Sequence, residues 1–291
     1  MGKKLWLLYA LITTVAWGLW GALTELSAEQ GFPETLIYVV WSVTMIIPAV
    51  IALKMVDWKL EKDSKSILFG LIIGFLGAGG QLALFTGAIT NGPAYLIFPI
   101  ISLSPVVTIL LSVLLLKEKT SSMGWLGIIL ALISIPFLSY QDPQGDVNSY
   151  AWFIYALIVF LAWGLQAYFM RFANRTMKAE SIFFYMTLTG LLLAPIAYYM
   201  TDFNQEINYG TKGLGMAFGI QILNSIGALM IVYAFRYGKA IIVSPLTNAV
   251  APVITVILSL ILYKTIPHTY IMIGMGIAVA SMFILATQEE G

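Results

Sequence analysis

The chain has 291 residues, of which 60% are hydrophobic and only 10% are charged, and its mean hydropathy is +0.90. Soluble domains carry about 25% charged residues, so this composition excludes an ordinary soluble protein and predicts an integral membrane protein. The net charge of +1 gives no reason to expect nucleic-acid binding. The absence of cysteine excludes disulfides, thiolate chemistry and cysteine-based metal sites.

Ten apolar stretches follow one another along the chain, and each is long enough to cross about 30 Å of hydrocarbon as a helix. Unpaired backbone groups cannot face lipid, so these stretches predict an all-α integral membrane protein with ten transmembrane helices. The first stretch follows Lys3 and Lys4 as a signal peptide would, but it continues to about Ala28 without a clear cleavage site, so a retained span is expected. The spans are expected at 5–27, 33–54, 67–90, 93–116, 122–139, 150–172, 180–200, 212–236, 240–263 and 268–286.

The two halves of the chain repeat each other. Ala-Trp-Gly-Leu occurs at 16–19 and again at 162–165, a shift of 146 residues. Pro-Val-Val-Thr at 105–108 matches Pro-Val-Ile-Thr at 252–255, a shift of 147 residues. A repeat of this kind fixes the architecture, and we predict one five-helix repeat at 1–141 and a second at 142–291.

Lysine and arginine are divided unevenly between the two sides of the predicted membrane. With a cytoplasmic N-terminus, 13 of the 15 Lys and Arg residues fall in cytoplasmic segments, and only Lys212 and Lys264 fall outside. The positive-inside rule then predicts a multi-pass protein of the plasma (inner) membrane with both termini in the cytoplasm. Because each repeat has five spans, the second copy is inserted upside down relative to the first, so the repeats are inverted.

Uncharged polar and aromatic residues occupy the spans, whereas ionisable residues are absent from the middle third of every predicted span. A carboxylate in mid-membrane is normally kept for ion coupling or cation binding, so its absence favours a neutral or zwitterionic substrate. Bonding between helices is the alternative role of the amides, and core packing is that of the tryptophans. The candidate substrate-binding residues are Trp17, Gln81, Tyr95, Ser102, Trp163, Gln166, Asn224 and Asn248.

Prolines recur at matching positions of the fourth and ninth spans, where the loss of a backbone donor interrupts a helix. Such breaks often flank a transporter's substrate site, so hinges are expected there. The candidate hinges are Pro99, Pro105, Pro245 and Pro252. Glu25 and Arg171 occupy equivalent positions with opposite charge, and they are either gate residues or markers of the two membrane faces.

Glycines and tryptophans add two smaller expectations. Gly70-x-x-x-Gly74 and its echo Gly215-x-x-x-Gly219 allow close helix contact, either inside one chain or in a dimer, so a monomer is expected with a dimer left open. Tryptophans near the span ends are expected to lie at the membrane interfaces. They are Trp6, Trp58, Trp125 and Trp152.

The chain resembles the drug/metabolite transporter superfamily, specifically its ten-helix EamA-type transporters. The resemblance covers nearly the whole chain and is carried by Ala-Trp-Gly at the start of each repeat and by the matching segments 92–118 and 238–262. It implies a central cavity lined by the first, third, fourth, sixth, eighth and ninth spans, on which the candidate amides fall. Glu118 has no acidic counterpart in the second copy, where Lys264 stands, and we expect it to make a cytoplasmic helix-end or loop contact.

The first span also resembles that of the small multidrug-resistance exporters, through the sequence 23–27 and the following Gly31-Phe32. Those exporters carry a membrane-embedded Glu that exchanges protons for cationic drugs. The best matching positions here are Trp17 and Trp163, which cannot ionise.

Two functional hypotheses within secondary transport follow. The first is export of amino acids or related metabolites, the usual EamA-type expectation, and the second is uptake of a neutral sugar or polyhydroxylated solute, which the amides and tryptophans favour. A membrane receptor or scaffold without transport is the alternative from another class. An enzyme is not expected from a chain with one histidine and no cysteine, and an ATP-binding loop, a cofactor and a metal are not expected either.

Overall fold

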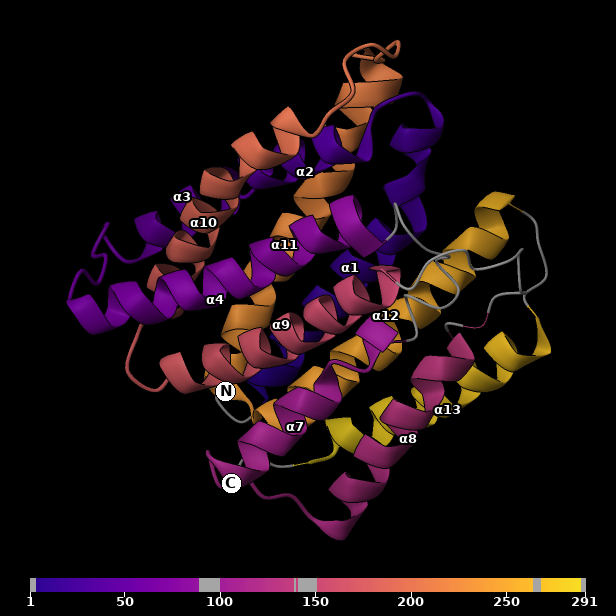
Figure 1. The fold of residues 1–291 in the computed structure, drawn as a ribbon. Coiled ribbons are helices and arrows are strands. Elements are labelled where there is room, and N and C mark those ends of the chain that lie inside the picture. Colours follow the sequence, from indigo (N-terminus) through magenta and orange to yellow (C-terminus); the bar gives the residue numbers. More distant parts are fainter. Residues whose placement is uncertain (1–3, 89–99, 139, 141–150, 264–267, 289–291) are drawn as a thin grey trace.

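The computed structural model describes residues 4–88, 100–138, 140, 151–263 and 268–288. The regular secondary structure of these segments is helical, and the helices lie side by side in a bundle (Figure 1). The elements are α1 (Leu5–Glu29), α2 (Glu34–Thr44), α3 (Ile46–Met55), α4 (Ser64–Ala83), the π-helical turn η1 (Leu84–Ala88), α7 (Pro105–Leu114), α8 (Ser122–Leu138), α9 (Ala151–Ala173), α10 (Ala179–Tyr199), the π-helical turn η2 (Thr211–Gly215), α11 (Met216–Tyr237), α12 (Ala240–Tyr263) and α13 (Thr269–Ala286).

Eight helices in the described segments are long and apolar enough to cross a membrane. They coincide with every predicted span except the fourth and the fifth, and α2 and α3 together form one of them, Glu34–Met55. The fourth and fifth positions hold shorter apolar helices, Ile100–Leu114 and Ser122–Leu138. Part of the predicted fourth span lies outside the described residues, so the count of ten remains a prediction.

Prolines act differently in the two halves. Pro105 begins α7 directly after a turn at Leu103 and Ser104, where its missing N–H costs no helical hydrogen bond. Pro245 and Pro252 instead lie inside α12, which continues through both, so the expected interruption of the ninth span is not seen. Pro99 lies outside the described residues.

Glycine sets how closely the helices approach. Helix α1 packs along α11 and α12, α4 packs along α9 and α10, and α8 packs along α13. Gly70 and Gly74 lie against Tyr185 and Thr189 of α10, so this glycine pair serves packing inside the chain. A Cβ on Gly219 would meet nothing within 4 Å, so the echo of that pair in α11 does not make the same contact.

Equivalent residues of the two halves make equivalent contacts with the opposite half. The Thr108 hydroxyl of α7 donates to the Gly164 carbonyl of α9 at 3.0 Å, and the Thr255 hydroxyl of α12 donates to the Gly18 carbonyl of α1 at 3.0 Å. The two threonines are 147 residues apart and the two glycines are 146 apart, which are the shifts of the sequence repeat. Each hydrogen bond therefore joins one half of the chain to the other.

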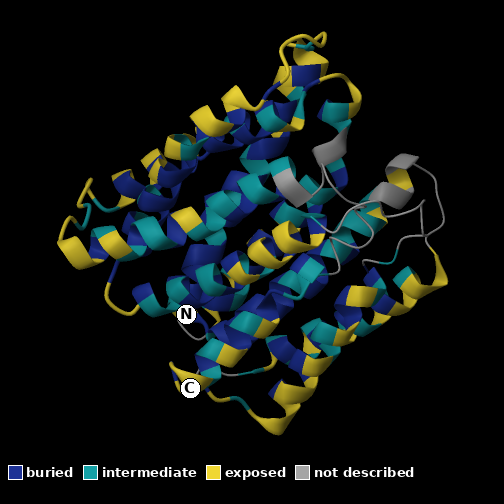
Figure 2. Cartoon of the chain, viewed as in Figure 1, coloured by how far each residue is buried: buried dark blue, intermediate teal, exposed yellow. Residues whose placement is uncertain are grey.

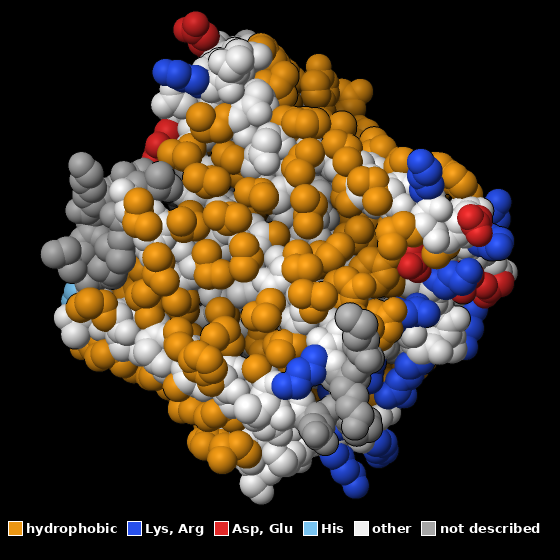
Figure 3. All heavy atoms as spheres, turned by 180° about the vertical axis from the view of Figure 1, so that it is seen from behind, with side chains coloured by type: hydrophobic (Ala, Val, Ile, Leu, Met, Phe, Trp, Pro, Cys, Tyr) orange, Lys and Arg blue, Asp and Glu red, His pale blue; other side chains and the backbone are white. Residues whose placement is uncertain are grey.

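The outer surface of the bundle is apolar. Figure 2 shows exposed residues along the outer faces of the helices, and Figure 3 shows a broad hydrophobic face with most of the visible Lys and Arg gathered toward one edge. Leu110, Ile129 and Phe283 are among the large hydrophobic side chains exposed there. Trp58 and Trp125 are also exposed, whereas Trp6 and Trp152 are buried in the core, so these two do not face the lipid as anchors at a membrane interface would.

Candidate functional site

The two tryptophans of the repeated Ala-Trp-Gly sequence lie over glycines of matching helices. A Cβ on Gly227 of α11 would lie 2.5 Å from the Trp17 indole of α1, and a Cβ on Gly80 of α4 would lie 2.6 Å from the Nε1 of Trp163 of α9. Gly80 and Gly227 are 147 residues apart. Both indoles are half-buried, so each offers part of its ring to the space beside the helices.

Hydrogen bonds join two indoles of α1 to one turn of α11. The Nε1 of Trp20 donates to the Oε1 of Gln221 at 3.2 Å, and that oxygen also accepts from the Nδ2 of Asn224 at 3.4 Å. The Nε1 of Trp17 donates to the Asn224 carbonyl at 3.4 Å. One turn of α11 therefore binds two of the tryptophans of α1, Trp20 through the Gln221 side chain and Trp17 through the backbone of Asn224.

The second half has a related but different arrangement. Gln166 occupies the position equivalent to Trp20, and its carboxamide lies against Gly77 of α4. Gln81, on the same helix, is buried. Each contact joins the two halves of the chain, with an indole on a carboxamide between α1 and α11 and a carboxamide on a glycine between α9 and α4.

The remaining candidates are more dispersed. Ser102 is half-buried just before the turn that precedes α7. The Nδ2 of Asn248 donates to the Ser244 carbonyl of its own helix at 2.9 Å, a bond within α12 rather than between helices. Tyr95 lies outside the described residues, as does the side chain of Glu25. Among the described residues, no group of three or more His, Asp or Glu is arranged to hold a metal ion.

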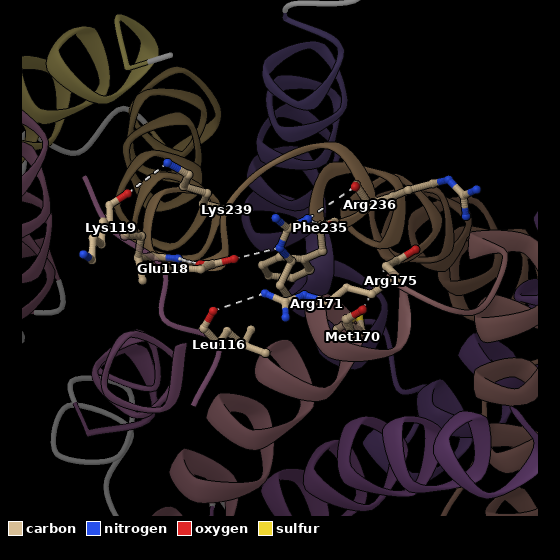
Figure 4. A network of polar contacts seen from close by, with 11 residues as sticks. Leu116, Glu118, Lys119, Met170, Arg171, Arg175, Phe235, Arg236 and Lys239 are labelled. Carbon is tan, nitrogen blue, oxygen red and sulfur yellow. Dashed lines mark hydrogen bonds and ion pairs between the residues drawn. The ribbon is translucent and has the colours of Figure 1, made fainter. Parts of the chain in front are cut away.

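Arg171 is bound in a network at one end of the bundle. Its Nε lies 2.7 Å from the Oε1 of Glu118, and its Nη1 donates to the carbonyls of Phe235 at 2.9 Å and Arg236 at 3.3 Å. The Oε2 of Glu118 accepts from the backbone N–H of Ile241 at 3.2 Å. Figure 4 shows the Glu118 and Arg171 side chains directed toward each other from separate segments.

Sequence reasoning missed two of these residues. Gln221 was not a candidate, although it precedes Asn224 by three positions in the same predicted span, and helical spacing places such residues on one face. Glu118 was expected to make a helix-end contact, which it does at Ile241, but its ion pair with Arg171 joins residues 53 positions apart. No spacing in the sequence signals a contact of that range.

Comparisons with known proteins agree with this architecture. The family model of the EamA-like transporter family matches twice, over residues 4–140 and 150–287. Protein LicB of Haemophilus influenzae is 27% identical over 152 residues, which cover 47% of this chain and 52% of that protein. An uncharacterised protein of Methanocaldococcus jannaschii, MJ1333.1, is 34% identical over 80 residues, covering 28% of this chain and 58% of that protein. The matched part of the chain thus spans little more than half the length of these relatives.

A solved crystal structure superposes with a TM-score of 0.78 over 96% of this chain and 98% of its own chain. Their sequences are 17% identical, so this likeness establishes the fold alone. The double family match covers nearly the whole chain and agrees with its eight span-length apolar helices. The chain is therefore a member of the EamA-like transporter family, within the drug/metabolite transporter superfamily, and is a multi-pass membrane protein.

Proposed function

We propose that the protein is a secondary transporter that moves a small neutral or zwitterionic metabolite by alternating access, with ten spans arranged as two inverted five-helix repeats. The observation that carries this proposal is the pair of equivalent hydrogen bonds from Thr108 to Gly164 and from Thr255 to Gly18. The first bond packs α7 on α9 and the second packs α12 on α1, so in each case the fourth predicted span of one half contacts the first predicted span of the other. Inverted halves that pack in this way can exchange their two arrangements and so open a central site to either side.

The contents of the site support an uncharged or zwitterionic substrate. The polar groups that bind the indoles of Trp17 and Trp20 are the Asn224 backbone carbonyl and the Gln221 carboxamide, and the Gln166 carboxamide lies against Gly77 of α4. Amides bind hydroxyl, carboxylate and ammonium groups without adding net charge. Export of amino acids or related metabolites is the function that we favour for such a site.

Uptake of a neutral sugar or polyhydroxylated solute is the second candidate. It is favoured by the bond between the Trp20 indole and the Gln221 carboxamide, because a flat ring beside an amide suits a ring that carries hydroxyl groups.

The orientation rests on the distribution of charge. Lys119, Arg171, Arg175, Arg236 and Lys239 lie together in or beside the network of Figure 4. We assign this end to the cytoplasm by the positive-inside rule. Trp6, at the start of α1, lies against Gly238 next to Lys239, and Gln288, which follows α13, accepts from the Ser121 hydroxyl close to Lys119. This supports a cytoplasmic location of both termini of a protein in the inner membrane.

The proposal is tested with purified protein in proteoliposomes. A thermal-shift screen against amino acids, sugars and nucleosides selects the substrate, and flux of that substrate is then measured. We expect Gln166→Ala to abolish flux in protein that remains folded. Asn248→Ala should do the same, because the bond of Asn248 within its helix uses the Nδ2 and leaves the Oδ1 for the substrate. Gln288→Ala, at the surface end of α13, is the matched control and keeps wild-type flux.

Two results would contradict the proposal. Unchanged flux in both amide variants would show that these side chains are structural. Ligand binding without flux of any solute in the panel would favour a receptor.

A further inference from the structure

The ion pair of Glu118 and Arg171 is buried and joins the two halves of the chain. The side chain of Glu118 is 4% exposed and that of Arg171 is 19% exposed, with 2.7 Å between the charged atoms. The other ion pair found among the described residues, Lys59 with Asp57, is fully at the surface and 3.5 Å long. Glu118 follows α7 of the first half, whereas Arg171 belongs to the last turns of α9 of the second half.

Each of the two charged side chains also meets a helix end whose partial charge has the opposite sign. Arg171 donates to the last carbonyls of α11, at Phe235 and Arg236, and Glu118 accepts from Ile241 in the first turn of α12. A helix carries partial negative charge at its C-terminus and partial positive charge at its N-terminus, so each side chain is stabilised by the helix end that it meets. One ion pair therefore binds the ends of α9, α11 and α12 to the segment that follows α7.

These are helices that line the cavity implied by the EamA-type resemblance. The indoles of Trp17 and Trp163 lie part-way along α1 and α9, whereas the ion pair lies at the helix ends that carry most of the positive charge. Along α9, the pair therefore lies between the level of Trp163 and that face of the bundle. Arg175 adds a weaker tie from α9 to the same segment, through its Nη2 and the Leu116 carbonyl at 3.3 Å.

A buried ion pair separates at low cost only when water hydrates both charges. Breaking a buried ion pair without hydrating it leaves an unpaired charge in a medium of low polarity, which is strongly unfavourable. Lys119, the neighbour of Glu118, lines a surface hollow of about 550 Å³ together with Lys239, so space open to solvent begins one residue from the pair. Separation and hydration of the pair are then one event.

We propose that Glu118 and Arg171 form a latch that holds the cytoplasmic end of the transport path closed, and that this end opens when the two side chains separate and become hydrated. The inference rests on the proposed function, since it assigns the latch to alternating access. It makes Glu118 and Arg171 positioning residues of the transport cycle that do not contact the substrate.

The natural absence of cysteine allows a direct test by single-cysteine labelling. Ser112→Cys and Ala240→Cys serve as two separate reporters, because both residues are buried at 0% exposure. Ser112 lies on α7 and its carbonyl accepts from the Glu118 N–H at 3.1 Å, and Ala240 begins α12 beside Ile241. A membrane-impermeant maleimide is applied to the cytoplasmic side of vesicles, and Lys119→Cys, which is exposed, reports that this side has been reached.

Each reporter is combined with Glu118→Gln, which removes the charge, and separately with Arg171→Lys, which keeps the charge but loses the planar group that reaches two carbonyls and the carboxylate. We expect at least one reporter to be labelled about tenfold or more faster in both backgrounds. Arg236→Gln is the matched control. Its Nη1 donates to the Met177 carbonyl at 3.1 Å, a contact within the second half, and labelling should not change.

A charge exchange distinguishes this latch from a simple ion pair. Glu118→Arg with Arg171→Glu restores opposite charges but places each at a helix end of the same sign, so fast labelling should persist. Wild-type labelling rates at both reporters in folded Glu118→Gln and Arg171→Lys protein would overturn the latch. Labelling needs no substrate, so fast labelling without flux of any solute would refute the proposed function, and the latch as part of it, while showing that the ion pair keeps this end of the bundle closed. Normal flux with unchanged labelling would refute the latch alone.

Discussion

Two glycines at equivalent positions of the repeat give a quantitative test of how the halves pack. A Cβ on Gly18 of α1 would lie 2.5 Å from the Cβ of Ile254 of α12, and a Cβ on Gly164 of α9 would lie 2.5 Å from the Cβ of Val107 of α7. Carbon atoms in contact prefer about 3.5–4.0 Å. Each alanine substitution therefore forces one helix away from its neighbour by about 1 Å.

The expected loss of stability follows from three contributions. Overpacking of this kind costs about 1–3 kcal/mol. Separation of the helices also weakens the threonine bond to the glycine carbonyl, and such bonds in membranes contribute about 0.6 kcal/mol. The higher helix propensity of alanine offsets up to about 1 kcal/mol of this loss of stability. We therefore expect Gly18→Ala and Gly164→Ala each to lower the free energy of unfolding by about 1–3 kcal/mol.

The assay is reversible unfolding of the purified protein in mixed micelles with an increasing fraction of denaturing detergent. Gly219→Ala is the control, because a Cβ there meets nothing within 4 Å. That variant gains only helix propensity, so it should be as stable as wild type or more stable by up to about 1 kcal/mol. If Gly18→Ala and Gly164→Ala unfold like the control, the helix contacts described for them do not contribute; if only one is destabilised, the two contacts are not equivalent.

Two further predictions concern single hydrogen bonds. Thr108→Val keeps the shape of the side chain but removes its bond to the Gly164 carbonyl, and it should lower the free energy of unfolding by about 0.6 kcal/mol in the same assay, whereas a loss above about 2 kcal/mol would mean that packing is disturbed as well. Asp63 caps α4 by accepting from Ser66, whose hydroxyl and backbone N–H hold the pKa of the Asp63 carboxyl below its usual value. Because the pKa is lowered in the folded state, this contribution to stability is present at neutral pH and is lost as the pH falls through the lowered pKa. Asp63→Ala should therefore speed amide exchange in the first turn of α4 at neutral pH, and equal exchange in both proteins there would contradict this role.

The helical class and the boundaries of most spans were predictable because composition and span length are direct consequences of the bilayer. The family was predictable from a resemblance carried by the repeated segments of the sequence. The repeated Ala-Trp-Gly sequence was informative for a physical reason that the structure supplies. Its glycine, Gly18 or Gly164, lets α12 or α7 approach closely, and its tryptophan packs against a glycine of α11 or α4. A repeat that carries the contacts between halves is conspicuous in the sequence because both copies need the same small residue.

The partners of individual side chains were less predictable. Proline at 245 and 252 indicated a broken helix by its chemistry, yet α12 continues through both positions, because neighbouring helices can hold a proline-containing segment helical. The interfacial position of Trp6 and Trp152 was inferred from their place near span ends, but burial depends on which face of the helix they occupy. The pairing of Glu118 with Arg171 depends on how the two halves pack, which no local pattern encodes.

The contact between α8 and α13 has a consequence for how this sequence can change over time. Gly127 of α8 faces Ile284 and Leu285 of α13, and Gly274 of α13 faces Phe137 and Leu138 of α8. These residues are related by a shift of 147, so the interface has the self-complementary form of a symmetric dimer inside a single chain. A larger residue at Gly127 would clash with Ile284 and Leu285, which are the second-half equivalents of Phe137 and Leu138. The two copies of this surface are therefore not free to diverge independently, and a substitution accepted in one half constrains what the other half can accept.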